Sequence, residues 1–286
     1  MQVVLSTYSL SAWMRETGKT QFDCLQKAKD LGFAGVELVD ICPPGGESLT
    51  DYATRLRREA DRLGLFFANL AIGANFLQEN DEAMDREIER LCGLVDAAVI
   101  LGAPRMRHDM LYVMPEGMTF EGIFDRLVDG CRRVTTYAAT RGVVTMIENH
   151  GYVCQHSERM LKLYHAVDHP NFGLLTDIGN FMCVDQDPAE AVAQVAPLAR
   201  YVHAKDFLYR RKEDADPGDG WFGTANGNRL RGTVVGHGIV PVPTCFGLLK
   251  AAGYDGPITL EFEGLERTDD AMLLGKANIE RIWNEV

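Results

Sequence analysis

The stretch V-V-T-M-I-E-N-H-G at residues 143–151 is the most informative part of this chain. Five apolar or β-favouring residues run without a charge, and Glu148 follows where the run ends. An uninterrupted apolar run bounded by turn residues is typical of a strand that is covered on both faces, as strands in parallel sheets are. A glutamate is seldom buried at the end of such a strand unless it is paired or holds a metal ion. We therefore expect a functional carboxylate at this position.

Three later stretches repeat the same design. Residues 172–177 read F-G-L-L-T-D, residues 201–206 read Y-V-H-A-K-D, and residues 258–263 read I-T-L-E-F-E. Each is a short apolar segment that ends in a side chain able to bind a metal ion, and these side chains are Asp177, His203 and Glu261. Together with Glu148 they provide four candidate ligands near the ends of four successive predicted strands.

Alternating strand and helix patterns run along the whole chain, and they predict an α/β fold with a single (β/α)8 TIM-barrel domain over residues 1–286. The strands are expected at residues 3–5, 33–38, 65–70, 104–107, 143–148, 172–177, 201–205 and 258–263. Several helices between them end at a glycine, as C-terminal caps commonly do. The alternative is an open doubly wound sheet, but no G-x-G-x-x-G motif follows the first strand.

Two segments are expected to be loops. Residues 6–13 read as a polar and aromatic loop after the first strand. Residues 207–235, after the seventh strand, are polar, rich in glycine and unusually long, and such connections are commonly functional or disordered. Trp221 and Phe222 in the middle of this long loop indicate packing, so we interpret it as a lid over the site. The alternative is that this loop extends into solvent and has no role at the site.

The composition excludes several classes of protein. Hydrophobic residues make up 46% and charged residues 24%, which is ordinary for a globular chain. A net charge of −12 argues against a nucleic-acid binder and against docking to an anionic membrane. No apolar run is long enough for a transmembrane helix, and no signal peptide is recognisable, so we expect a cytoplasmic protein. The seven cysteines form no C-x-x-C pair, which fits reduced thiols.

The four strand-end ligands predict a metal site. Active-site residues of a TIM barrel lie at the C-terminal ends of its strands, where these side chains would meet. Carboxylates crowded together raise one another's pKa unless a cation neutralises them. A set of two Glu, one Asp and one His suits one divalent ion, namely Mn²⁺, Mg²⁺, Co²⁺ or Zn²⁺. The alternative is that each side chain forms a separate salt bridge or cap.

Side-chain alternation along the strands predicts further pocket residues. If Glu148, His203 and Glu261 point inward, Lys205 faces the same cavity and Asp206 faces away from it. The candidates for contact with a substrate, from strand ends and the loops after them, are His150, Asn180, Lys205, Arg107, His108 and Trp13. Glu37, inside the second predicted strand, could line the pocket or form a salt bridge at the strand end.

Six segments of the chain resemble the xylose-isomerase-like TIM-barrel superfamily of sugar phosphate isomerases and epimerases. They are G-F-A-G-V-E-L, M-I-E-N-H-G, L-T-D-I-G-N, V-H-A-K-D, G-H-G and L-E-F-E, and they span residues 32–263. The superfamily includes ketose 3-epimerases, hydroxypyruvate isomerase and inosose dehydratase. The resemblance implies that Glu148, Asp177, His203 and Glu261 hold one divalent metal ion, and that the two glutamates act as the acid/base pair.

The chain departs from the ketose epimerases of this superfamily at two positions. Those enzymes carry a histidine three residues after the metal-binding aspartate, where this chain has Asn180. They also carry an arginine six residues after the metal-binding histidine, where this chain has Tyr209 followed by Arg210. Both positions contact the substrate in that subgroup, so the resemblance implies a sugar or sugar-derived substrate without specifying which one.

The predicted chemistry is proton transfer α to a carbonyl through a metal-stabilised enediolate. One glutamate takes the proton, and its return to the opposite face or to the neighbouring carbon gives epimerisation or isomerisation. Three alternatives stay open: metal-dependent dehydration of a keto-cyclitol, a Schiff-base aldolase through Lys205, and a sugar-binding barrel without catalysis. Abasic-site nuclease activity, also known in the superfamily, is disfavoured by the −12 charge. Phosphorylation of the sugar and the oligomeric state, homo-oligomers included, stay open as well.

Overall fold

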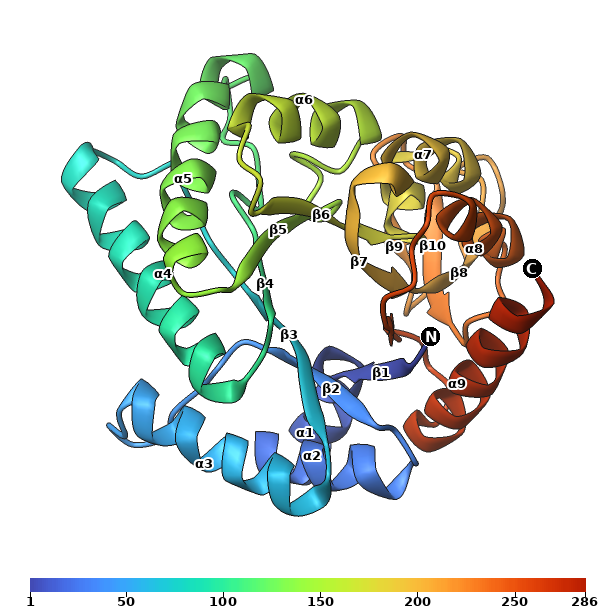
Figure 1. The fold of residues 1–286 in the computed structure, drawn as a ribbon. Coiled ribbons are helices and arrows are strands. Elements are labelled where there is room, and N and C mark those ends of the chain that lie inside the picture. Colours follow the sequence, from blue (N-terminus) through green and yellow to red (C-terminus); the bar gives the residue numbers. More distant parts are fainter.

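The computed structural model describes residues 1–286 and shows a closed barrel of eight parallel strands with helices around it (Figure 1). The barrel strands are β1 (Val3–Ser6), β2 (Gly35–Val39), β3 (Phe66–Ile72), β4 (Arg105–His108), β5 (Val144–Glu148), β6 (Phe172–Asp177), β7 (Ala199–Ala204) and β11 (Ile258–Leu260). They follow chain order around the barrel, and β11 closes it by pairing with both β7 and β1. The predicted TIM barrel is confirmed.

Helices cover the outside of the barrel. They are α2 (Gln21–Asp30), α3 (Leu49–Leu63), α4 (Asp81–Leu101), α5 (Phe120–Thr140), α6 (Ser157–Val167), α7 (Pro188–Val195), α8 (Val242–Ala251) and α9 (Thr268–Glu285). The local sequence explains their ends: the Asn80 side chain accepts a hydrogen bond from the backbone of Ala83 at the start of α4, and Gly102 ends that helix with a φ of 71°. Glycine adopts this left-handed conformation without steric penalty. None of the helices is both long enough and apolar enough to cross a membrane.

The segment after β1 is helical, so the prediction of a loop at residues 6–13 was wrong. Thr7–Leu10 form a 3₁₀ helix, η1, and Ser11–Thr17 form helix α1. Leu10 is buried, and Trp13 and Met14 pack against the core. These three residues stand at i, i+3 and i+4, which is the spacing of one helix face. The short helical pattern was hidden by the polar residues between them.

Residues 206–233 form a small antiparallel sheet rather than a structureless loop. Its strands are β8 (Asp206–Arg210), β9 (Phe222–Gly223) and β10 (Arg229–Thr233), in the order β8-β10-β9. We call this the accessory sheet, and it follows directly on barrel strand β7. Phe207 and Leu230 are fully buried, and the ring of Phe222 packs edge-on against Phe207 with 5.7 Å between their centroids. Burial of these apolar residues stabilises the sheet within an otherwise polar segment.

The interior of the barrel is filled by a cluster of five buried residues, Val4, Ala68, Met146, Leu175 and Tyr201. Met146 and Tyr201 each lie two residues before a predicted metal ligand, Glu148 and His203. Side chains two residues apart on a strand share a face, so these five residues form the floor beneath the ligands. We refer to them as the barrel floor. A separate, larger apolar core lies between the strands and the helices.

Candidate metal centre and its pocket

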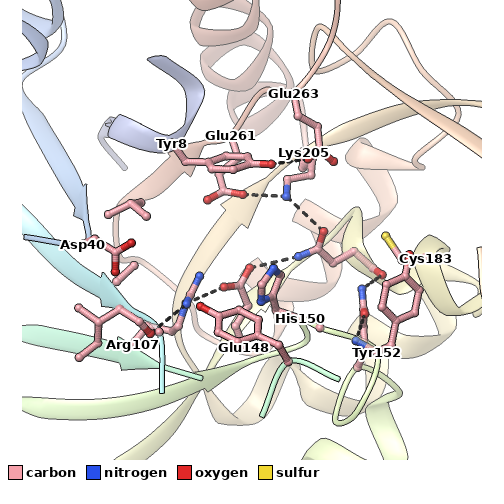
Figure 2. A pocket seen from close by; sticks show the side chains of 18 of the residues that line it. Tyr8, Asp40, Arg107, Glu148, His150, Tyr152, Cys183, Lys205, Glu261 and Glu263 are labelled. Carbon is pink, nitrogen blue, oxygen red and sulfur yellow. Dashed lines mark hydrogen bonds and ion pairs between the residues drawn. The ribbon is translucent and has the colours of Figure 1, made fainter. Parts of the chain in front are cut away.

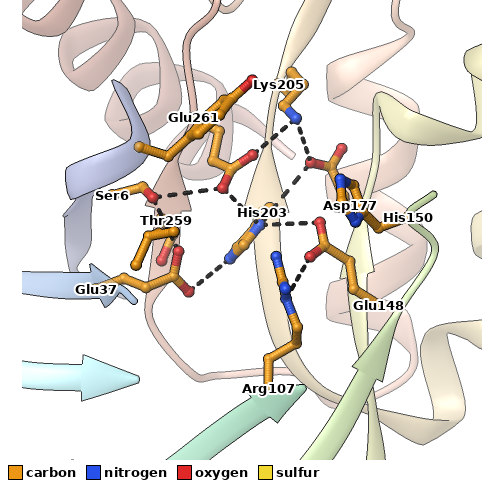
Figure 3. A network of polar contacts seen from close by, with 12 residues as sticks. Ser6, Glu37, Arg107, Glu148, His150, Asp177, His203, Lys205, Thr259 and Glu261 are labelled. Carbon is orange, nitrogen blue, oxygen red and sulfur yellow. Dashed lines mark hydrogen bonds and ion pairs between the residues drawn. The ribbon is translucent and has the colours of Figure 1, made fainter. Parts of the chain in front are cut away.

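The four predicted ligands converge inside the C-terminal end of the barrel (Figure 3). Glu148 and Asp177 end β5 and β6, His203 lies near the end of β7, and Glu261 follows β11. One ligand atom from each side chain lies within 4.8 Å of all the others, and all four residues are buried. The parallel register explains this convergence, because Asp177 and Thr259 both pair with His203 in the sheet.

His203 presents its Nδ1 atom to the three carboxylates. This nitrogen lies 3.3 Å from Glu261 Oε1, 3.4 Å from Glu148 Oε1 and 4.0 Å from Asp177 Oδ2. The other ring nitrogen, Nε2, lies 2.7 Å from Oε2 of Glu37, on β2. Glu37 therefore accepts a hydrogen bond from the Nε2–H group and directs Nδ1 towards the cluster, as carboxylates behind metal-binding histidines commonly do.

Glu37 is held rigidly by its own neighbours. It is fully buried, and its two oxygens accept hydrogen bonds from Ser6 Oγ at 3.0 Å and from Asn69 Nδ2 at 2.9 Å. It does not line the pocket. Of the two sequence-based interpretations, the structure supports the ion pair, with His203 as the partner.

Three buried atoms of the cluster lack a hydrogen-bond partner: Glu148 Oε2, His203 Nδ1 and Asp177 Oδ2. Glu148 Oε2 faces Nε of Arg107 at 2.8 Å, which leaves His203 Nδ1 and Asp177 Oδ2. The other oxygen of Asp177 is satisfied, because the backbone N–H groups of Gly179 and Asn180 donate to it at 2.8 and 2.9 Å. Unpartnered buried polar atoms are rare and costly in proteins. A divalent cation among these donors would satisfy both atoms at once, so the residues fit such an ion.

When no cation balances them, the charged side chains of the cluster strongly shift one another's pKa. Burial raises the pKa of Asp177 to about 6, with Glu261 and Glu148 adding to the effect and Lys205 opposing it. Burial disfavours the charged form of His203, but the surrounding glutamates outweigh it and raise the pKa of its imidazole well above the ordinary value. A proton on Nδ1 and a metal ion are therefore alternatives, and binding of the ion would release the proton.

Each of the two glutamates has one oxygen in the cluster and the other next to a basic side chain. Glu148 Oε2 lies 2.8 Å from Nε of Arg107, and Glu261 Oε2 lies 2.8 Å from Nζ of Lys205. Burial raises the pKa of Glu148, but Arg107 and His203 outweigh it, and the pKa lies well below its ordinary value. The pKa of Glu261 is likewise lowered by Lys205 and His203 against the effect of burial.

A second polar network adjoins the cluster and was missed from the sequence. Asp109, directly after β4, accepts hydrogen bonds from Arg107 at 3.1 Å and from Nδ1 of His150 at 3.1 Å. The ring of Tyr112 stands edge-on to the His150 ring, with 5.8 Å between centroids. Asp109 thus fixes Arg107 and His150 together. The signal in the sequence was a carboxylate two residues past the end of the strand predicted at residues 104–107.

Asn180 and Lys205 link the remaining members of the site. Lys205 Nζ donates to Asn180 Oδ1 at 3.2 Å, and Asn180 Nδ2 donates to Glu148 Oε1 at 3.2 Å. The Lys205 ammonium also lies 5.4 Å from the ring centre of Tyr8. Lys205 and Asn180 therefore bridge the two glutamates along one side of the cluster.

A cavity of about 410 Å³ opens above the cluster (Figure 2). Of the residues predicted to contact a substrate, Arg107, His150, Asn180 and Lys205 line it. Its other lining side chains include Tyr8, Asp40, Tyr112, Glu148, Tyr152, Phe222, Glu261 and Glu263. Phe222 belongs to the accessory sheet, so the segment predicted as a lid does reach the pocket.

Two predicted contact residues lie outside this cavity. His108 is fully buried, and its Nδ1 donates to the backbone oxygen of Asp109 at 2.8 Å. It follows Arg107 in β4, so strand alternation turns it away from the pocket. Trp13 lies on α1 beneath the ammonium of Lys27, at 5.1 Å from its ring centre, and lines a separate surface hollow.

Asp206 faces away from the cavity, as alternation predicted. Its carboxylate accepts hydrogen bonds from the backbone N–H groups of Phe207, Gly236, Gly238 and Val240 at 2.8–3.0 Å. It therefore fastens the G-H-G turn to the start of the accessory sheet.

Comparison with known proteins shows which protein family the chain matches. A model of the xylose isomerase-like TIM barrel family matches residues 25–278. Among solved structures, D-psicose 3-epimerase from Clostridium cellulolyticum H10 with D-tagatose is 14% identical, with a TM-score of 0.76 and 99% of each chain covered. A probable 3-DHS dehydratase from Bacillus anthracis is 20% identical, with a TM-score of 0.74 over 98% of this chain and 99% of that one.

A third similar structure contains a metal ion. It is a xylose isomerase-like TIM barrel protein from Mycobacterium smegmatis in complex with magnesium, 18% identical, with a TM-score of 0.73 over 92% of this chain and 88% of that one. At these identities the likeness establishes the fold, while the chemistry of this chain has to be inferred from its own residues.

Proposed function

Because the chain belongs to the xylose isomerase-like TIM barrel family, we propose that it is a divalent-metal-dependent sugar isomerase or epimerase. The observation that carries the proposal is the cluster of Glu148, Asp177, His203 and Glu261, whose ligand atoms lie within 4.8 Å of one another at the bottom of a pocket. Figure 3 shows Glu148 and Glu261 on either side of the His203 ring. Two carboxylates so arranged can serve the two proton transfers of an isomerisation or epimerisation.

The four ligands would hold one divalent ion, which supplies positive charge beside a substrate carbonyl and its neighbouring hydroxyl. The chain's own residues move the proton. Arg107 cannot lose its proton at any physiological pH, so its partner Glu148 stays ionised and suits the role of base. Glu261, whose second oxygen forms an ion pair with Nζ of Lys205 at 2.8 Å, is assigned the return of the proton from the other side of the cluster.

The remaining polar residues would orient the sugar. Asp109 occupies Nδ1 of His150, which leaves Nε2 of that ring for a substrate hydroxyl. The Asn180 amide, between Glu148 and Lys205, can bond a second hydroxyl. Fixing the reacting carbon between two carboxylates in this way lowers the entropic part of the barrier.

The test is hydrogen exchange at the carbon next to the carbonyl. The protein is loaded with Mn²⁺ or Mg²⁺ and incubated in D₂O with a panel of ketoses and keto-cyclitols, and deuterium in the sugar is followed by NMR. Chelation should abolish the exchange, and Glu148→Gln or Glu261→Gln should slow it by about 10²–10⁴-fold, the usual contribution of a general base. Exchange that persists after chelation, or its absence across the panel, would contradict the proposal.

A metal-dependent dehydratase is the second candidate, and one observation favours it. The Asp109–His150 pair gives the pocket an acid/base group besides the two glutamates. Loss of water requires protonation of the departing hydroxyl as well as removal of a proton. The same D₂O incubations separate the two activities, because dehydration produces an alkene signal and a loss of mass of one water molecule.

Two further alternatives have less support. The Lys205 ammonium is paired with Glu261 at 2.8 Å, whereas a Schiff-base lysine has to be neutral to attack a carbonyl. Treatment with borohydride and a carbonyl substrate should therefore trap no adduct. A sugar-binding barrel without catalysis would retain sugar affinity in Glu148→Gln and show no exchange in the unmodified protein either.

A further inference from the structure

The pocket has two chemically different halves. Its inner half contains the acidic cluster with Lys205 and Arg107. Its outer half presents aromatic rings: Tyr112 and Tyr152 are 47% and 46% exposed. Phe222 also lines the pocket, is partly buried, and packs against Phe207 of the accessory sheet. Resting on the proposed function, we propose that the outer half is a second subsite. It takes a ring joined to the reacting sugar, so that the substrate class is glycosides whose reacting sugar carries a carbonyl, rather than free monosaccharides.

Tyr152 is held at the mouth in a conformation that side chains rarely adopt. Its φ is 64°, and it follows Gly151, whose φ is 75°. The left-handed region is costly for a bulky residue, and such strain persists at functional positions where the surroundings impose it. Here the Tyr152 N–H donates to Gln155 Oε1 at 2.8 Å, and its hydroxyl donates to the Gly223 carbonyl at 3.0 Å. The ring is thereby fixed although it is half exposed.

Tyr112 is fixed beside it. Its backbone packs against Gly151, where an added Cβ would lie 3.2 Å from the Tyr112 carbonyl oxygen. The Tyr112 hydroxyl packs against Gly73. A Cβ atom at position 73 would lie only 2.5 Å from this hydroxyl, so the glycine provides the space that the tyrosine occupies. Its ring stands edge-on to His150 of the inner half. Both tyrosines are therefore held in place before a ligand arrives, which reduces the entropy lost on binding.

Phe222 completes the outer half from a different element. It lies on β9, and the carbonyl of the neighbouring Gly223 accepts the hydrogen bond from the Tyr152 hydroxyl. This bond joins the accessory sheet to the loop after β5 across the mouth of the pocket. The three rings thus come from the loop after β4, the loop after β5 and the accessory sheet. A monosaccharide held by the inner polar residues would leave these rings in water. A second ring in the ligand would cover them.

The charges of the pocket favour a neutral ligand. Its only basic lining residues are Arg107, His150 and Lys205. Arg107 is paired with Glu148 and Asp109, His150 with Asp109, and Lys205 with Glu261. No basic side chain in the pocket is free of a carboxylate partner to bind a phosphate group. The outer subsite therefore suits the apolar face of a second pyranose ring or of an aromatic substituent, both of which stack on tyrosine rings.

The experiment compares ligands that share one sugar and differ in what it carries. Mn²⁺-loaded full-length protein is titrated with methyl β-D-glucopyranoside, phenyl β-D-glucopyranoside, cellobiose and glucose 6-phosphate, and binding is followed by ligand-observed NMR. We expect phenyl glucoside or cellobiose to bind at least about ten-fold more tightly than methyl glucoside. A preference for phenyl glucoside would identify an aromatic substituent, and a preference for cellobiose a second sugar.

Matched variants locate the effect. Tyr152→Ala and Tyr112→Ala should each reduce the ratio of the affinity for phenyl glucoside or cellobiose to the affinity for methyl glucoside. Tyr152→Phe, which keeps the ring and loses the bond to Gly223, should retain most of the preference. Mn²⁺ affinity, measured by EPR on each variant, verifies that the metal centre is folded.

Equal binding of methyl and phenyl glucosides and cellobiose, no binding of any of them, or tightest binding of glucose 6-phosphate would overturn the subsite. The D₂O exchange assay on the same preparation keeps the two proposals separate. Exchange without a preference for a second ring would overturn only the subsite. A preference without exchange on any carbonyl substrate would overturn only the proposed function.

Discussion

Among single residues, Glu37 tests whether the metal centre depends on the side chain behind His203. Glu37→Gln should lower affinity for Mn²⁺ by about 10–100-fold, the usual effect of changing a partner that orients a metal-binding histidine. The reason is that the glutamine cannot fix the Nε2 proton as a carboxylate does. Isothermal titration calorimetry provides the measurement, and Glu89→Gln, at an exposed position on α4, is the matched control. Unchanged affinity in Glu37→Gln would show that the ring is oriented by packing alone.

Asp109 should act through His150 rather than independently of it. If the exchange activity is found, Asp109→Asn and His150→Asn should each reduce kcat. Asp109→Asn weakens the hydrogen bond that orients the His150 ring, and His150→Asn removes the ring itself. The double variant should be no slower than the slower single variant, since residues that act as one unit are not additive. Multiplied effects in the double variant would assign Asp109 a separate task, such as positioning Arg107.

His108 should make stability depend on pH. Burial lowers the pKa of this imidazole below the ordinary value of 6.5, while the unfolded chain titrates normally. Below about pH 6.5 the unfolded state therefore binds a proton that the folded state does not, so the free energy of unfolding falls as pH falls, by at most about 1.4 kcal/mol per pH unit. Urea denaturation from pH 7.5 to 5 measures this. In His108→Asn, whose amide can replace the Nδ1 donor, the slope should be smaller, and an equal slope would contradict the assignment.

At the scale of elements, Asp206 should hold the accessory sheet and the G-H-G turn together. Asp206→Asn replaces an acceptor of four backbone N–H groups with a side chain that has one acceptor oxygen. We expect a loss of about 2–4 kcal/mol in the free energy of unfolding, because buried N–H donors lose charged partners. Chemical denaturation measures it, with the exposed Asp219→Asn as control. Faster hydrogen exchange should be confined to residues 206–240.

The elements of the barrel could be predicted from the sequence because their signals are local. Apolar runs mark the strands, and glycines such as Gly64 and Gly102 end the helices. The accessory sheet could not be predicted in the same way. Its strands pair across a polar segment, and β9 consists of only two residues, Phe222 and Gly223. Its stability comes from the burial of Phe207 and Leu230, which depends on packing that no short window of sequence reveals.

In the candidate site, too, the features with a local sequence signal could be predicted, and the features that depend on contacts between distant segments could not. The convergence of the four candidate ligands could be predicted because each lies at the end of its own strand, and a barrel brings strand ends together. The roles of Glu37 and Asp109 could not, since their partners come from other strands: Glu37 reaches His203, 166 residues away, and Asp109 reaches His150, 41 residues away. The position of His108 outside the cavity could also have been anticipated, because strict alternation after Arg107 turns that side chain outward.

At the scale of the whole molecule, the metal ion should contribute to stability. The apo protein contains three buried carboxylates whose mutual repulsion a cation would relieve. At a free metal concentration of about 100 times Kd, binding to the folded state alone adds about 2.7 kcal/mol to the free energy of unfolding. Thermal denaturation with and without EDTA should show a lower Tm after chelation. In Asp177→Asn this difference should shrink, and an equal Tm in the unmodified protein with and without metal would refute the centre.

The barrel floor has a consequence for turnover. Val4, Ala68, Met146, Leu175 and Tyr201 fill the barrel beneath the four candidate ligands, so no passage leads from the pocket through the floor of the barrel. A substrate that enters past Tyr112, Tyr152 and Phe222 therefore has no exit through the barrel, and its product has to leave on the side from which the substrate came. A departing product and an arriving substrate therefore cannot pass each other, and accumulated product should act as a competitive inhibitor that slows each successive cycle.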